Sequence, residues 1–147
     1  MVEGLKMSER AETTLVMVDD NMDEIFLTRR SVRQEGIVNR FVSEKKPEHL
    51  METLDELVEM GVDKKSFLIL LDINMPRTNG FETLKAIRAH QEYKDVSVVM
   101  LSASEDEEDM FESFELGSDG YMVKPFTGDE FFAAVQNIPK IKKQLIQ

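Results

Sequence analysis

The stretch Phe67–Pro76 reads FLILLDINMP. Five consecutive apolar residues before Asp72 are typical of a strand that is buried on both faces of a parallel sheet. Pro76, with Asn79 and Gly80 soon after it, indicates that the chain then enters a loop. Because open α/β sheets bind ligands at the carboxyl ends of their strands, we expect Asp72 to lie at the reactive edge of such a sheet.

Four further apolar runs have the length of strands, and helical patterns separate them. The runs are Thr13–Val18, Val38–Val42, Val96–Leu101 and Gly120–Val123. The helical patterns, with their apolar stripes, are Asn21–Glu35 (Met22, Ile25, Phe26, Val32), Pro47 to Gly61 (Leu50, Leu54, Leu57, Val58), the segment after Gly80 (Phe81, Leu84, Ile87), the segment from Ser104 (Met110, Phe111, Phe114, Leu116) and the segment from Thr127 (Phe131, Phe132, Val135, Ile138). The last two patterns begin with capping boxes, Ser104–Glu107 and Thr127–Glu130. Five strands alternating with five helices predict one α/β domain with a parallel sheet and right-handed crossovers.

Composition narrows the range of functions. The chain has 147 residues, a formal net charge of −11 and no cysteine. The length fits one domain with its own core. The negative charge argues against nucleic acid or an anionic membrane surface as a partner. The lack of cysteine excludes disulfides and thiolate chemistry and fits a cytoplasmic protein, and no apolar run approaches the length of a membrane span.

Polar groups stand at the ends of four predicted strands. They are Asp19-Asp20, Asp72, Ser102 and Lys124. One such residue is most simply a solvated strand end, but parallel strands bring all of these groups to one edge of the sheet. Crowded carboxylates repel each other unless a cation lies among them, and oxygen-only ligands suit Mg²⁺. The backbone carbonyl of Asn74 would complete the ligand set.

The same groups suggest phosphoryl transfer. A metal ion and the Lys124 ammonium would neutralise charge on an incoming phosphoryl group. Asp72 would attack this group and form an acyl phosphate. Ser102 would then donate a hydrogen bond to a phosphoryl oxygen. His49 and His90 lie in charged helical stretches, and we interpret them as surface residues rather than phosphohistidines.

Over about residues 13–138, the chain resembles the receiver domains of two-component response regulators. The matching motifs are Val18-Asp19-Asp20, Leu71–Pro76 with Gly80, Leu101-Ser102-Ala103 and Tyr121–Phe126. The resemblance implies a flavodoxin-like sheet of strand order 2-1-3-4-5. The chain departs from the usual pattern at Arg77–Asn79, which should alter only the loop, and it has Ser102 where threonine is commoner.

The resemblance also implies a role for each motif residue. Asp72 would be the phosphoacceptor, and Mg²⁺, or Mn²⁺ in its place, would be held by Asp19, Asp20, Asp72 and the Asn74 carbonyl. Lys124 would bind the phosphate, with a cis bond to Pro125, while Ser102 and Tyr121 would form the switch. Asn74 and Ser104 would tune hydrolysis of the acyl phosphate, although Ser104 is equally well explained as a helix N-cap. Such a phosphoacceptor is not an enzyme acting on other substrates.

The resemblance further implies partners. The phosphoryl donor would be a sensor histidine kinase. The sequences of the segments Val18–Glu24 and Ser113–Gly117 resemble those of receivers that are paired with phytochrome-type kinases. Only about ten residues follow Ile138, so we expect a stand-alone regulator that signals to a downstream protein target. The contact surface would comprise the fourth helix, fifth strand and fifth helix, which phosphorylation would rearrange.

The expected domain boundaries leave two short end segments. Residues 1–12 are expected to form a flexible N-terminus, 13–138 the domain and 139–147 a tail. Ile138, Ile141 and Leu145 have helical spacing, and Pro139 should bend or restart the helix there. This stripe is either a frayed end without a role or an arm that forms a homodimer.

Three other functions remain open. A phosphatase of the haloacid-dehalogenase type would carry an Asp-x-Asp pair after the first strand, where this chain has adjacent Asp19 and Asp20. A flavodoxin-like FMN carrier would need a phosphate-binding loop at that place, where two acids would repel phosphate. A scaffold that uses the fold without phosphoryl transfer is the third.

Overall fold

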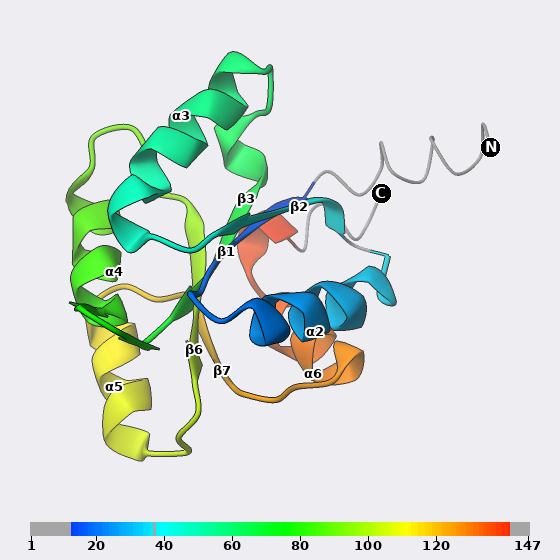
Figure 1. Cartoon of the computed structure of the whole chain (residues 1–147), viewed down its shortest axis with the longest axis vertical. Helices are drawn as coiled ribbons and strands as arrows, with labels where there is room; N and C mark the ends of the chain where they lie inside the picture. The colour runs from blue at the N-terminus through cyan, green and yellow to red at the C-terminus, as the bar shows by residue number, and fades with distance from the viewer. Residues whose placement is uncertain (1–12, 37, 142–147) are drawn as a thin grey trace.

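A computed structural model of the chain describes residues 13–36 and 38–141. This part contains a five-stranded parallel sheet with the hydrogen-bonded order β2-β1-β3-β6-β7 (Figure 1). The strands are β1 Thr13–Val18, β2 Val38–Glu44, β3 Phe67–Asp72, β6 Ser97–Ser102 and β7 Gly120–Val123. Counted along the chain, the order is 2-1-3-4-5, so the predicted topology is confirmed.

The central strand is β3, as its apolar sequence predicts. All six of its residues are buried, and it pairs with β1 on one side and β6 on the other. A strand that has neighbours at both edges and helices on both faces contacts almost no water, which is why it tolerates an unbroken apolar run. Asp72 is its last residue and pairs with Leu101 of β6.

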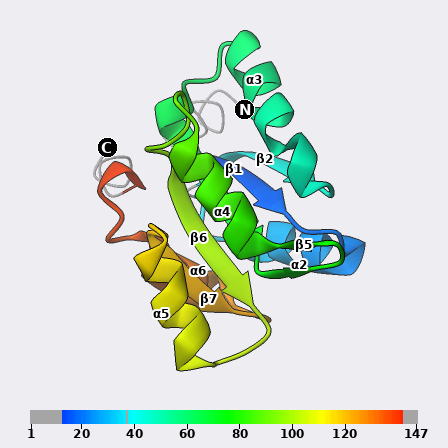
Figure 2. The ribbon, with the colours of Figure 1, turned by 90° about the vertical axis from the view of Figure 1, so that its left-hand side faces the viewer.

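Helices cover both faces of the sheet (Figures 1 and 2). The helices are α2 Met22–Arg33, α3 Leu50–Glu59, α4 Gly80–Ala89, α5 Glu107–Glu115 and α6 Gly128–Val135, and a short 3₁₀ turn, Pro47–His49, precedes α3. One core joins strand residues such as Val16 and Ile69 to α3 and α4. The other core joins alternate strand residues, such as Leu15 and Leu70, to α2 and α6. The period-two alternation along each strand thus supplies both cores.

Two helical stripes are placed differently from the sequence prediction. Ile25 and Val32 of α2 are buried, but Met22 and Phe26 are exposed by 56% and 65%. In α5, Met110, Phe111 and Phe114 are all exposed, and Ser113 is the buried residue. The interpretation of nearly all of these stripes as core packing was therefore wrong for the exposed side chains of α2 and α5, and also for Val58 of α3, which is 39% exposed.

The capping predictions had opposite outcomes. Thr127 and Glu130 form the predicted reciprocal capping box at the start of α6. At the start of α5, the cap is Asp106, whose side chain accepts a hydrogen bond from the Glu108 amide. Ser104 lies two residues earlier and accepts from the Asp106 amide at 3.0 Å, so it is not the N-cap. Asp106 is the N-cap because an aspartate side chain caps a helix as well as a serine does, and Asp106 directly precedes the first residue of α5.

The end of the described chain folds back on the domain. Helix α6 ends at Val135, and helical geometry resumes at Pro139, where the sequence predicts a bend or restart. Ile138 and Ile141 are buried, at 4% and 1% exposure, in the core beneath α2 and α6. These two residues therefore do not form an exposed stripe, and Leu145 lies outside the described residues.

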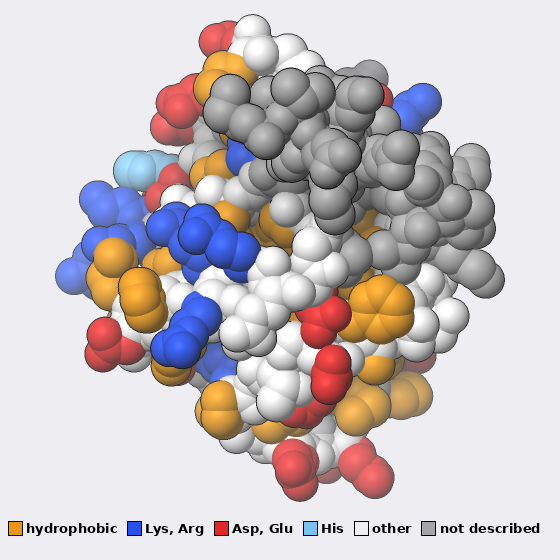
Figure 3. Space-filling view, turned by 90° about the vertical axis from the view of Figure 1, so that its right-hand side faces the viewer, with side chains coloured by type: hydrophobic (Ala, Val, Ile, Leu, Met, Phe, Trp, Pro, Cys, Tyr) orange, Lys and Arg blue, Asp and Glu red, His pale blue; other side chains and the backbone are white. Residues whose placement is uncertain are grey.

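Charge is distributed unevenly over the surface. Residues 105–115, which include α5, contain acidic side chains and no Lys or Arg. Helix α2 instead exposes Arg29, Arg30 and Arg33. Figure 3 views the side on which α2 and α6 lie, and there Lys and Arg side chains gather on one part of the face. The net negative charge therefore does not make every surface acidic.

Candidate phosphoryl and metal site

The carboxyl ends of four strands converge on one acidic pocket. Asp19 follows β1, Asp72 ends β3, Ser102 ends β6 and Lys124 follows β7. One oxygen from each of Asp19, Asp20 and Asp72 lies within 4.8 Å of the others. A parallel sheet predicts this convergence, and the structure brings all of these residues together.

Asp72 is held from two sides. Its side chain is 3% exposed, and its Oδ1 accepts hydrogen bonds from Lys124 Nζ at 3.1 Å and from the Asn74 amide at 3.3 Å. Burial raises the pKa of Asp72 more than the Lys124 ammonium and the Asn74 amide lower it. Behind it, Gly80 packs so closely that a Cβ there would lie 2.2 Å from the Asp72 carbonyl oxygen. The position of Asp72 is thus fixed by backbone as well as by side-chain contacts.

Asp19 has a buried oxygen that accepts no hydrogen bond within the described chain and lies 3.7 Å from the Lys124 ammonium nitrogen. Its Oδ1 accepts from the Asn21 amide at 2.9 Å, while Oδ2 has no hydrogen-bond partner among residues 13–36 and 38–141. Burial, and next the nearby Glu24, raise the pKa of Asp19 to about 7. A buried, unsatisfied carboxylate oxygen beside two other carboxylates is what a hard cation would satisfy. The residues present therefore fit Mg²⁺ or Mn²⁺, with Asp20 exposed at the open side of the pocket.

Lys124 is surrounded by three acids. Its Nζ lies 2.7 Å from Glu24 Oε2, 3.1 Å from Asp72 Oδ1 and 3.7 Å from Asp19 Oδ2. Burial lowers the pKa of Lys124, but Glu24, Asp72 and Asp19 together outweigh it, so the net shift is upward. The peptide bond to Pro125 is cis, as the resemblance implied.

Glu24 is the pocket residue that the sequence reasoning missed. It lies in the first turn of α2, where an acid has an ordinary explanation as a favourable partner of the helix dipole. Its position just after the pair Asp19-Asp20, at the start of the next helix, was the signal available in the sequence. A residue in that first turn can reach back over the strand ends.

Ser102, Ser104 and Tyr121 form a chain of contacts beside the pocket. Ser102 is fully buried, and its Oγ accepts from the Ser104 amide at 3.0 Å. The half-buried Tyr121 donates its hydroxyl to the Ser104 carbonyl at 2.9 Å. The Lys124 amide donates to the Ser102 carbonyl at 2.8 Å. Any movement of the Ser102 loop would therefore reach both the lysine and the tyrosine.

The fold and this pocket define a class of protein. Doubly wound parallel sheets bind their ligands beyond the strand ends, and here that edge carries a buried carboxylate, a group of three acids that could hold a cation, and a lysine. A family model described as the response regulator receiver domain matches residues 15–136. The chain belongs to this family.

Individual relatives agree with the family. The transcriptional regulatory protein ResD of Bacillus subtilis (strain 168) is 34% identical over 130 residues, which are 88% of this chain and 49% of ResD. The solved bacteriophytochrome response regulator AtBRR is 26% identical with a TM-score of 0.72, covering 86% of this chain and 92% of that one. The Mn²⁺-bound response regulator Rcp1 is 26% identical with a TM-score of 0.65, covering 86% and 91%. The chain spans about half the length of the curated relatives it matches.

No helix in residues 13–36 and 38–141 combines the length and the apolar character that a membrane-crossing helix needs.

Proposed function

We propose that this receiver domain accepts a phosphoryl group on Asp72 from a sensor histidine kinase in a Mg²⁺-dependent reaction. The observation that carries the proposal is the contact of Asp72 Oδ1 with Lys124 Nζ at 3.1 Å, inside a group of acids that includes the orphaned Asp19 Oδ2. A nucleophile, a cation-binding site and a fixed positive charge thus lie within one pocket.

Each residue has a role that follows from its position. An Asp72 oxygen forms a bond to phosphorus while the bond from phosphorus to the imidazole nitrogen of the kinase's phosphohistidine breaks, and the imidazole leaves with the electron pair. Lys124 moves its hydrogen bond from the Asp72 carboxylate to the transferring group. Asp19, Asp20, Asp72 and the Asn74 carbonyl would hold the metal ion, which would supply charge neutralisation for the phosphoryl oxygens. Asn74 and Ser104 follow Asp72 and Ser102 by two residues each, and their side chains would set the access of water to the acyl phosphate. The domain transfers phosphate only to itself, and we do not assign it a separate substrate.

The signal to a downstream protein would start from Ser102 and Tyr121. When the Ser102 hydroxyl turns to a phosphoryl oxygen, it no longer accepts the hydrogen bond from the Ser104 amide. The Ser104 carbonyl, which holds the Tyr121 hydroxyl, then shifts with its loop. The surface formed by α5, β7 and α6 changes its packing, and a downstream protein reads the change.

The similarity to AtBRR supports a phytochrome-type kinase as the donor. The helix α2 surface beside the pocket, with exposed Phe26 and Leu27, offers apolar area for such a partner.

Three further predictions stay untested. They are that the protein acts as a stand-alone regulator, that it forms a homodimer and that it is located in the cytoplasm.

The test is phosphorylation by acetyl phosphate in the presence of Mg²⁺, followed by intact-mass measurement. We expect one phosphoryl adduct that hydroxylamine removes and that chelation of Mg²⁺ prevents. Asp72→Asn should abolish the adduct, whereas the exposed Asp129→Asn, an equal change of charge, should leave it unaffected. A hydroxylamine-stable adduct, or one that survives Asp72→Asn, would contradict the proposal.

A further inference from the structure

The shortest ion pair of Lys124 is with a residue outside the metal-binding group. Glu24 Oε2 lies 2.7 Å from Lys124 Nζ, closer than Asp72 Oδ1 at 3.1 Å. The Lys124 side chain is 12% exposed and that of Glu24 is 36% exposed. Burial raises the pKa of Glu24, but contacts with Asp19 and Lys124 lower it by more. The net shift is downward, so Glu24 is ionised at neutral pH. A rim carboxylate thus shares the lysine with the buried nucleophile.

Helix α2 keeps Glu24 in this place. The Asn21 side chain accepts a hydrogen bond from the Glu24 amide at 3.1 Å, which fixes the first turn. Ile25 and Thr28 are buried on the inner face of the helix. The Glu24 carboxylate therefore lies beside Lys124 in the resting pocket without further adjustment.

Glu24 also lines a cavity that opens beside the lysine. The cavity has a volume of about 270 Å³, and its walls include Glu24, Leu27, Thr28, Ala103, Lys124 and Phe126. A phosphoryl donor that approaches Lys124 from this side meets the Glu24 carboxylate. The carboxylate repels an anionic donor and competes with it for the ammonium.

We propose that Glu24 is a positioning residue that holds Lys124 in the unphosphorylated pocket and so restrains phosphorylation of Asp72 by small anionic donors. This inference rests on the proposed function. With acetyl phosphate, an Asp72 oxygen forms a bond to phosphorus while the bond from phosphorus to the acetate oxygen breaks, and acetate leaves with the electron pair. Lys124 must contact the phosphoryl oxygens during this step, and its hydrogen bond to Glu24 opposes that shift.

The experiment compares Glu24→Gln with Asp23→Asn. Asp23 is exposed in the same helical turn, and its substitution removes the same charge from a side chain outside the ion pairs of Lys124. At saturating Mg²⁺, Glu24→Gln should be phosphorylated by acetyl phosphate roughly three to ten times faster than wild type, the range that loss of a partly exposed ion pair supports. Asp23→Asn should stay within about twofold of wild type.

Two further measurements separate the role of Glu24 from a general effect on the fold. Affinity for beryllofluoride, which mimics the phosphoryl group on Asp72, should rise in Glu24→Gln and Glu24→Ala by the same factor as the rate. At about pH 8, where Asp19 is largely ionised with or without Glu24, the affinity for Mg²⁺ alone, measured by calorimetry, should change by less than about twofold. Glu24→Asp keeps the charge and should return the rate toward that of wild type.

The outcomes distinguish this inference from the proposed function. Equal rates for Glu24→Gln and Asp23→Asn, with the wild type labelled normally, would overturn the role of Glu24 and leave Asp72 as the phosphoacceptor. A loss of Mg²⁺ affinity larger than about twofold in Glu24→Gln at about pH 8 would also overturn it, because Glu24 would then act on the cation. Failure of the wild type to accept phosphate would overturn the proposed function, and this inference with it.

Discussion

Asp19 combines a buried carboxylate with a strongly shifted pKa. The pKa is raised from 3.8 to about 7, first by burial and next by Glu24. Between these two values the folded state binds more protons than the unfolded state, so the stability of the metal-free protein falls as pH rises. The raised pKa of Asp72 acts in the same direction. A cation that binds the ionised carboxylates reverses this loss.

Magnesium should therefore stabilise the protein more at about pH 8 than at about pH 5.5, because protons compete for Asp19 at the lower pH. Glu24, with its lowered pKa, and Lys124, with its raised pKa, keep the same charge at both values and add no difference. Thermal unfolding with and without Mg²⁺ measures the effect. Asp19→Asn should lose most of the pH dependence, and an equal increase in Tm at both pH values would contradict the assignment.

At this scale the sequence predicted most of the pocket. Asp19, Asp72, Ser102 and Lys124 were found because strand ends in a parallel sheet share one edge. Glu24 was missed because it belongs to a helix, and the pattern of apolar residues does not show which first-turn side chain reaches over the sheet. The structure brings Asp19, Asp20 and Asp72 close enough to share a cation, while metal binding and the roles of these residues in phosphoryl transfer stay proposals.

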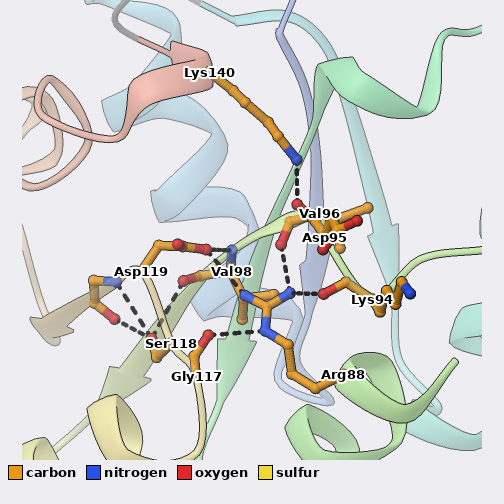
Figure 4. A network of polar contacts seen from close by, with 10 residues as sticks. Arg88, Lys94, Asp95, Val96, Val98, Gly117, Ser118, Asp119 and Lys140 are labelled. Atoms are coloured by element: carbon orange, nitrogen blue, oxygen red, sulfur yellow. Dashed lines mark hydrogen bonds and ion pairs between the residues drawn. The ribbon is translucent and has the colours of Figure 1, made fainter.

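At the scale of elements, Arg88 connects three segments at the sheet edge opposite the pocket (Figure 4). From the last turn of α4, its guanidinium donates to the carbonyls of Lys94, Val96 and Gly117 at 2.7–2.9 Å and pairs with Asp119 at 3.0 Å. Asp119 also accepts from the Val98 amide, and Lys140 contacts the Asp95 carbonyl nearby. One side chain thus joins α4, the loop before β6 and the loop before β7.

Arg88→Ala should lower the free energy of unfolding by roughly 2–3 kcal/mol, because several charge-assisted hydrogen bonds are lost together. Lys85→Ala, on the same helix, removes only an exposed pair with Glu82 and should change stability by less than about 0.5 kcal/mol. Urea unfolding of both variants measures the difference. Similar losses for the two would show that the Arg88 network contributes little.

The helix predictions failed where an apolar side chain faces water. Met22, Phe26, Phe111 and Phe114 have helical spacing that favours a buried stripe, but the structure exposes them. Periodicity identifies a face with apolar character and does not say whether the chain's own core or another molecule covers it. Small inward residues, such as Thr28 in α2 and Ser113 in α5, carry no hydrophobic signal and so were overlooked.

At the scale of the whole molecule, the core extends past the family match. That match ends at residue 136, yet Ile138 and Ile141 are buried in the core beneath α2 and α6. The strand order and the two-faced core were predictable from the alternation of elements. The burial of Ile141 was not, because its helical spacing is equally compatible with an exposed arm.

Ile141→Ala should therefore destabilise the domain by about 2–4 kcal/mol, as expected for a large-to-small change in a core. Val58→Ala, at a position that is 39% exposed, should lose less than about 1 kcal/mol. A chain that is cut after residue 141 keeps Ile141 in the core. Sedimentation of this shortened chain therefore tests whether the tail mediates dimer formation without removing a core residue. A small loss for Ile141→Ala would contradict the observed packing.

The inward-facing Ser113 affects how firmly α5 is attached. With a serine beneath it and aromatic rings above, the helix makes few apolar contacts with the sheet, and its detachment should require only a fraction of the global unfolding energy. Amide hydrogens in such a segment exchange early. The helix that borders the Ser102 loop should thus open at a low cost in free energy, and its aromatic rings stay exposed to water until another molecule covers them.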